Sequence, residues 1–161
     1  MFPRLETLHL SYNAIPSSHV AQLRFLRRLR VLDLASNDLI TLPDDLSFFT
    51  QLEDLNVSAN LFASNSTLVK PTAVFNALNS IPKLKKLNIS RNKLQSLHLE
   101  ETPAGPRFAS LQDLDFSYNK VELQDELFSA KEFSSLQLIN ITGNPFAMRS
   151  HEHYAELETV L

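Results

Sequence analysis

The sequence contains no cysteine and only two glycines among its 161 residues. Without cysteine it has no disulfide framework, no thiolate metal site and no thiol nucleophile. The two glycines, Gly105 and Gly143, are too few to build the glycine-rich loop that cradles a phosphate or a dinucleotide. No apolar run approaches the roughly 20 residues needed to cross a bilayer, and the first residues lack the apolar stretch of a signal peptide. These absences favour a binding protein over an enzyme, with no cofactor and no membrane insertion.

Charge and composition narrow the class further. The chain has a formal net charge of −3 at pH 7, whereas nucleic-acid-binding domains normally present a basic face. We therefore expect no nucleic acid among its partners. Apolar residues make up 43% of the sequence, which is enough for a buried core, and leucine alone occurs 29 times.

The leucines recur in a single frame. Leu5, Leu8 and Leu10 are followed by Asn13 and Ile15, which gives the pattern LxxLxLxxNxI. The frame starts again at residues 29, 52, 84, 111 and 136, with an apolar residue at every apolar position and asparagine at every asparagine position. A large apolar residue also stands three positions before each first leucine. A domain boundary would break this phase, so the six frames form one continuous array.

This frame resembles the leucine-rich repeat, and the resemblance covers residues 2–146. In physical terms, LxL is a short strand whose alternate leucines point inward, and the asparagine amide can pair with backbone groups of neighbouring coils. One unit cannot bury its leucines alone, so the core forms only when the units stack. We predict an α/β fold, a curved leucine-rich-repeat solenoid with a short parallel β-sheet on the concave face and helices or irregular turns on the convex face.

The same pattern predicts how the chain is organised. Residues 1–146 are expected to hold the six repeats, and residues 147–161 a helix that resembles the C-terminal cap of intracellular leucine-rich-repeat proteins. Because the chain begins in the middle of the pattern, we expect a fragment of a longer solenoid. Helices are predicted after Asn13, capped near Ser17 or Ser18, from Pro71, and within residues 123–133. Residues 2–43 also resemble, more faintly, the X-ray radiation resistance-associated family.

The outward strand positions form the predicted concave face, where we expect a protein partner to bind. Neighbouring strands lie about 4.8 Å apart, so six of them make a trough on the order of 24 Å across, wide enough for a helix or a loop of another protein. The alternative is a structural role, because the family prefers Asp or Asn at the central outward position. The candidate partner-binding residues are His9, Tyr12, Asp33, Asp54, Asn56, Lys86, Asn88, Arg91, Asp113, Asp115, Tyr118 and Asn140.

Three other motifs carry less weight. The histidines of His151-Glu152-His153 stand two residues apart and point to different sides of a helix, so we expect no metal site. Four arginines between residues 24 and 30 are interpreted as the solvent-facing side of an amphipathic helix. Glycosylation sequons begin at residues 56, 65, 88 and 140, and only Asn65 lies outside the repeat consensus, in a long loop. No strained nucleophile turn is present, so we expect no catalytic residues.

Together these patterns predict a non-catalytic protein–protein interaction module, a scaffold or adaptor that binds through the concave face as a preformed surface. One alternative is a structural component of a large cytoskeletal or ciliary assembly. Another is a regulatory subunit that docks an enzyme such as a phosphatase, as some members of the family do. Extracellular members usually seal their ends with disulfide-bonded caps, so the absence of cysteine predicts an intracellular, cytoplasmic location.

Overall fold

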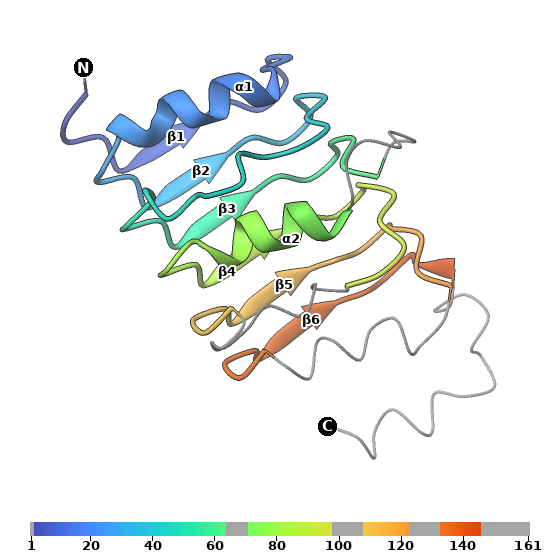
Figure 1. Ribbon diagram of the computed structural model, residues 1–161. Helices are drawn as coiled ribbons and strands as arrows, with labels where there is room; N and C mark the ends of the chain where they lie inside the picture. The colour runs from blue at the N-terminus through green and yellow to red at the C-terminus, as the bar shows by residue number, and fades with distance from the viewer. Residues whose placement is uncertain (1, 64–70, 98–107, 123–132, 146–161) are drawn as a thin grey trace.

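A computed structural model describes residues 2–63, 71–97, 108–122 and 133–145. Six three-residue strands lie side by side in chain order and run parallel in a single sheet (Figure 1). The strands are β1 (Thr7–His9), β2 (Val31–Asp33), β3 (Asp54–Asn56), β4 (Lys86–Asn88), β5 (Asp113–Asp115) and β6 (Leu138–Asn140). The repeat frame sets their register, because its second leucine position lies at the centre of every strand. Its central leucines face one another from Leu8 to Leu114.

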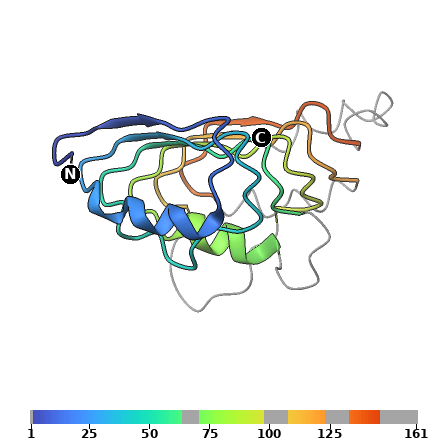
Figure 2. The same ribbon diagram turned by 90° about the horizontal axis from the view of Figure 1, so that it is seen from above.

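The helices lie on the side of the coils opposite the sheet (Figure 2). They are α1 (Ser17–Val20), the 3₁₀ helix η1 (Ala21–Phe25) and α2 (Pro71–Asn79). The predicted α/β solenoid, with a parallel sheet on one face and helices and turns on the other, is therefore confirmed. The helix predicted from Pro71 is also confirmed.

The first helix differs from the prediction. It has four α-helical residues, tightens into a 3₁₀ segment and ends at Phe25, so Arg27, Arg28 and Arg30 lie beyond it. Pro16 occupies the N-cap position and makes no side-chain capping hydrogen bond, so the predicted cap at Ser17 or Ser18 is wrong. Serine and histidine are weak helix formers, and the segment must turn early to place Leu29 in the core. The helices predicted within 123–133 and 147–161 lie outside the described residues.

The core is one continuous cluster that extends along the stacked coils. The central strand leucines Leu32, Leu55, Leu87 and Leu114 are all at most 2% exposed. The helix α2 adds Val74, Phe75, Ala77 and Leu78, and Phe75 lies 6.3 Å from Phe116, measured between ring centroids. Each coil thus buries its apolar side chains against the next coil, which is why the array needs no separate domain core.

Buried asparagines join successive coils. The Asn92 side chain is fully buried: its Oδ1 accepts a hydrogen bond from the Asn60 backbone N–H at 3.1 Å, and its Nδ2 donates to Val57 and Ile89 carbonyls. Equivalent bonds join the asparagines of the other described coils, namely Asn37, Asn60, Asn119 and Asn144. These bonds satisfy backbone groups that the turn after each strand leaves without a sheet partner. The sequence-based role of the asparagine is therefore confirmed.

Candidate functional site

The sheet face, meaning the outward side chains of β1 to β6, contains most of the predicted partner-binding residues. Asp54, Lys86 and Asp113 begin their strands and lie opposite one another in register. The last residue of each strand forms a second row, composed of His9, Asp33, Asn56, Asn88, Asp115 and Asn140. Tyr12, Arg91 and Tyr118 follow β1, β4 and β5 at one equivalent position. The structure thus brings the predicted residues onto one surface, while their role in binding stays a prediction.

The second row also has a structural role. The Asp33 Oδ1 accepts a hydrogen bond from the backbone N–H of Ala35 at 2.9 Å. The same bond, from the backbone N–H two residues further along the chain, recurs in the other coils at Asn56, Asn88, Asp115 and Asn140. These side chains stabilise the turn after each strand. That role explains why Asp or Asn is the last residue of every strand from β2 to β6. The recurrence of Asp and Asn at this position is therefore explained by the turns, without a bound partner.

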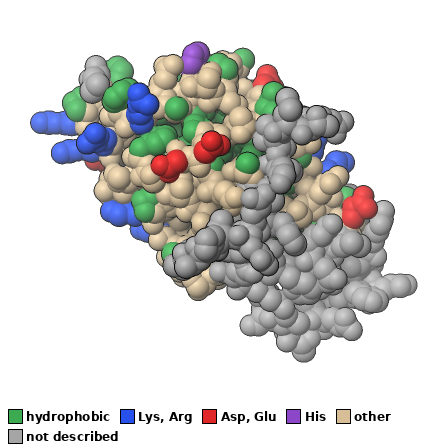
Figure 3. Space-filling view, viewed as in Figure 1, with side chains coloured by type: hydrophobic (Ala, Val, Ile, Leu, Met, Phe, Trp, Pro, Cys, Tyr) green, Lys and Arg blue, Asp and Glu red, His purple; other side chains and the backbone are tan. Residues whose placement is uncertain are grey.

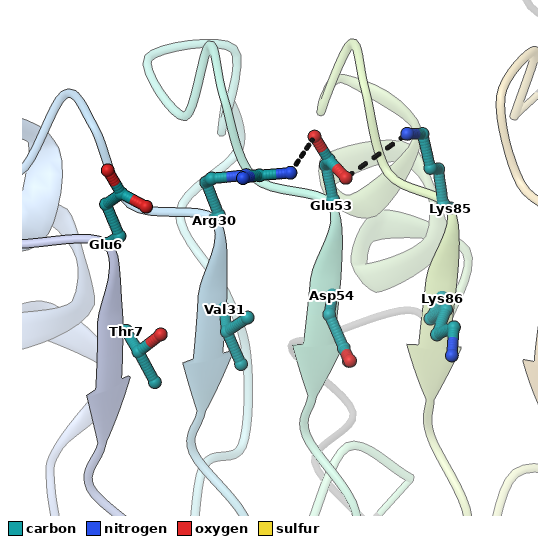
Figure 4. Close-up of a pocket in the computed structure, with 8 residues that line it drawn as sticks. All are labelled: Glu6, Thr7, Arg30, Val31, Glu53, Asp54, Lys85 and Lys86. Carbon is teal, nitrogen blue, oxygen red and sulfur yellow. Dashed lines mark hydrogen bonds and ion pairs between the residues drawn. The ribbon is translucent and has the colours of Figure 1, made fainter.

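A third row, directly before the strands, was not predicted from the sequence. Glu53 accepts a hydrogen bond from the Arg30 guanidinium at 3.1 Å and pairs with the Lys85 ammonium at 3.2 Å, so one carboxylate joins three coils (Figure 4). The Lys85 ammonium, together with Arg30, holds the pKa of Glu53 below its usual range. The sequence could have predicted this row, because residues at the same position of successive repeats lie side by side on neighbouring coils.

The third row and the first strand residues surround a shallow depression of about 270 Å³. Figure 4 shows the two rows crossing four neighbouring strands, with Glu6, Arg30, Glu53 and Lys85 above Thr7, Val31, Asp54 and Lys86. Carboxylates and cations alternate along it, and few apolar side chains line it. Such an open polar surface suits another protein better than an apolar small molecule, which needs a concave apolar pocket.

The residues three positions after the last residue of each strand form a fourth row with unusual backbone geometry. Tyr12, Ser36, Ala59, Arg91 and Tyr118 all have positive φ angles between 52° and 59°, and Gly143 has φ 75°. The Arg91 guanidinium carbon lies 4.3 Å from the centre of the Tyr118 ring. A Cβ on Gly143 would lie 2.5 Å from Tyr118 Cδ1, so the ring rests directly over the glycine. Arg91, Tyr118 and Gly143 thus stack across three successive coils.

A second depression, of about 430 Å³, lies beside the first coil and is mainly apolar. Phe2 and Phe25 line it and are 72% and 52% exposed. Basic side chains gather on the helix-bearing side near this end of the molecule (Figure 3).

In the parts of the chain that the structure describes, no group of three side chains from histidine, cysteine, aspartate and glutamate converges to hold a metal ion. His151-Glu152-His153 lies outside these residues. Over the same residues, none of the helices has the length and apolar character that crossing a membrane requires.

A parallel sheet built from stacked repeats, with a rigid and polar outer face, defines an interaction solenoid of the leucine-rich-repeat class. Residues 3–62 match the family model described as leucine rich repeat. The chain belongs to the leucine-rich-repeat family.

Three relatives show how far the similarity extends. Tsukushi from Gallus gallus is 30% identical over 89% of this chain and 49% of its own length. Podocan from Mus musculus is 35% identical over 88% of this chain and 22% of its own length. Toll-like receptor 2 type-2 from Gallus gallus is 26% identical over 90% of this chain and 19% of its own length. The chain thus spans about half the length of Tsukushi and a smaller share of the other two.

Proposed function

We propose that the chain is a non-catalytic protein-interaction module that binds its partner through the sheet face. The observation that carries this proposal is the first strand row. Asp54, Lys86 and Asp113 lie in register on β3, β4 and β5, yet no hydrogen bond or ion pair within the described residues occupies their side chains. The neighbouring rows, in contrast, hold turns and internal ion pairs. These three charges are therefore available to a partner without disrupting the fold.

Rigidity supports the same function. The strands are paired on both sides from β2 to β5, and the buried asparagines fix the turns that follow them. A surface that is already ordered loses little conformational entropy when a partner binds. The mixed charges would then select the partner and its orientation more than they add raw affinity.

Similarity to an enzyme does not change the proposal. Adenylate cyclase from Schizosaccharomyces pombe is 31% identical over 75% of this chain, but the match covers 6% of that protein. A match of this extent is what shared repeats produce. The matched relatives also give no support to the intracellular location expected from the absence of cysteine.

The test is a charge exchange on the sheet face. In the double variant Asp54→Lys and Lys86→Asp, the net charge is unchanged while the charge pattern of the sheet face is reversed. Affinity capture with the wild-type chain identifies partners by mass spectrometry, and each purified partner is then titrated against both proteins. We expect binding at least about tenfold weaker in the double variant, because like charges then face each other across the interface.

A matched exchange outside the sheet is the control. Arg28 and Asp44 are exposed and lie outside the sheet, and the double variant Arg28→Asp and Asp44→Arg also leaves the net charge unchanged. This variant should bind partners as the wild type does. If it loses them while the sheet variant keeps them, the structural alternative, with contacts through the helix-bearing side, replaces the proposal. A captured enzyme whose activity changes on binding would instead favour the regulatory-subunit alternative.

A further inference from the structure

We infer that a basic rim at the end of β4 and β5 binds an acidic segment of the partner protein. The basic rim consists of Arg91, Lys93 and Lys120 together with the Tyr118 ring, all of them exposed. This inference rests on the proposed function and adds the chemistry of the partner. Lys93 and Lys120 were not among the candidate residues from the sequence, although they share one position of the repeat frame.

The backbone places these side chains together. The Arg91 N–H donates to the Ser117 carbonyl at 3.0 Å, and the Lys120 N–H donates to the Leu94 carbonyl at 2.7 Å, so the two coils are joined before and after the buried asparagines. Arg91 and Lys93 both have positive φ angles, 58° and 60°, on either side of fully buried Asn92. This geometry directs the asparagine inward and leaves its two neighbours at the surface. The rim is therefore preorganised by the core.

Among the described residues, the charges of the rim have no ionic partner. Arg30 and Lys85, in the third row, are in contrast both paired with Glu53. Within the residues that the structure describes, no carboxylate lies within 4.0 Å of the cationic groups of Arg91, Lys93 or Lys120. The protein thus pairs Arg30 and Lys85 with Glu53, whereas Arg91, Lys93 and Lys120, in two adjacent coils, have no ion pair among the described residues. Unpaired cations concentrated in this way attract carboxylates.

The contact between Arg91 and Tyr118 favours carboxylate binding in particular. The guanidinium carbon lies over the face of the Tyr118 ring, 4.3 Å from the ring centre. The N–H groups lie in the plane of the guanidinium and remain free for a bidentate carboxylate. The ring is itself held in place over Gly143. Stacking therefore orients Arg91 without using its hydrogen-bond donors.

The surroundings favour a short acidic protein segment over a nucleic acid. Asp113 and Asp115 lie on β5, next to the rim, and the whole chain has a net charge of −3. A nucleic acid is a continuous polyanion, and it would be repelled by these carboxylates beside the contact. A peptide can place a few carboxylates on the rim and neutral or basic residues beside β5. Charge complementarity thus selects a locally acidic protein segment.

The test measures binding of a fluorescein-labelled poly-glutamate peptide to the 161-residue chain by fluorescence anisotropy. We expect measurable binding at low salt, and a loss of affinity of about tenfold or more in the double variant Lys93→Glu and Lys120→Glu. The double variant Arg27→Glu and Arg28→Glu changes the net charge by the same amount away from the rim, and it should bind nearly as the wild type does. Equal losses in the two variants would mean that only net charge matters and would overturn the inference.

Two neutral variants test the stack separately from the charge. Tyr118→Ala removes the ring, and Gly143→Ala forces the ring aside, while neither alters the net charge. Each should weaken peptide binding several-fold, with folding checked by circular dichroism and urea unfolding. Unchanged binding in Tyr118→Ala would exclude the stack from the site.

A single-stranded DNA oligonucleotide and phosphatidylserine vesicles serve as competing probes. If either probe binds more tightly than the poly-glutamate peptide, and its binding depends on the rim, then the ligand belongs to that probe's class and the inference is overturned. Failure of this inference can also be distinguished from failure of the proposed function. If partners are captured, depend on Asp54 and Lys86, and bind the rim variants normally, the sheet face is an interaction surface but the rim is not part of it.

Discussion

Asparagine occupies two positions in the repeat and has a different physical role at each. Asn88 ends a strand, and its Oδ1 accepts hydrogen bonds from the backbone N–H and the hydroxyl of Ser90. Asn92 is fully buried, and its side-chain amide bonds to backbone groups of its own coil and of the preceding coil. The Asn88 side chain is partly exposed and bonds within its own turn. The Asn92 side chain is buried and bonds to backbone groups that have no partner in the sheet. Substitutions at the two positions should therefore have very different costs.

At the residue scale, replacing Asn92 by alanine should lower the free energy of unfolding by about 3 kcal/mol, because several buried backbone groups lose their partners. Asn13 is the control, since it occupies the same frame position in the first coil. It is exposed, and its side-chain amide bonds only to the Ser11 carbonyl. Asn13→Ala should cost less than about 1 kcal/mol. Urea unfolding followed by circular dichroism measures both variants, and similar losses would contradict the inter-coil role of the buried asparagines.

At the scale of the strands, the row before the sheet depends on charge and therefore on pH. The carboxylate of Glu53 lies between Arg30 and Lys85, one on each neighbouring coil. The Lys85 ammonium is the larger of the two causes that lower the pKa of Glu53 from its ordinary value of 4.5. The ionised form is therefore favoured in the folded state. Its contribution to stability is fully present above the ordinary pKa and is lost as the pH falls through the lowered one.

Glu53→Gln tests this pH dependence. The wild-type chain should be more stable than the variant at neutral pH, and the difference should shrink as the pH falls below about 4.5, where the carboxylate becomes protonated. High salt should reduce the difference as well, because the side chains of Arg30 and Lys85 are about half exposed. Urea midpoints across a pH series give the result. A difference that stays constant from neutral to acid pH would exclude an ionic role for Glu53.

At the scale of the whole molecule, the first coil is less protected than the central coils. Among the described residues of the 161-residue chain, β1 pairs with β2 alone, and Leu8 is partly exposed, whereas Leu55 and Leu87 are 2% exposed. In a solenoid each repeat contacts only its neighbours, so stability varies along the array. Opening of the first coil should therefore need less free energy than opening of the middle.

Hydrogen exchange measures this gradient. The amide of Leu10 donates to Asp33 across β1 and β2, and the amide of Val57 donates to Asn88 across β3 and β4. Both bonds are 2.8 Å long, so local geometry does not separate them. We expect the Leu10 amide to exchange at least tenfold faster, because it needs only local opening. Equal protection at the two sites would show instead that the array unfolds as one cooperative unit.

The sequence by itself determined the parts of this protein that depend on periodicity. The frame LxxLxLxxNxI fixed which residues point inward, which asparagines are buried, and that six strands stack in parallel register. It also placed the candidate residues on one face, since strands repeat with a period of two residues. The first helix was predicted less well, because its short length depends on where the core needs Leu29, and not on the propensity of its own residues.

Only the tertiary structure decided which side chains meet. The frame places Arg30 beside both Glu6 and Glu53, but the guanidinium pairs with Glu53, 23 residues away in the sequence. The same carboxylate holds Lys85, 32 residues further on, and leaves Arg91, Lys93 and Lys120 without internal partners among the described residues. Side-chain rotamers and the spacing of coils set these contacts, and neither quantity is periodic in the sequence. Repetition therefore fixed the scaffold, and packing between unequal coils decided the chemistry of its surface.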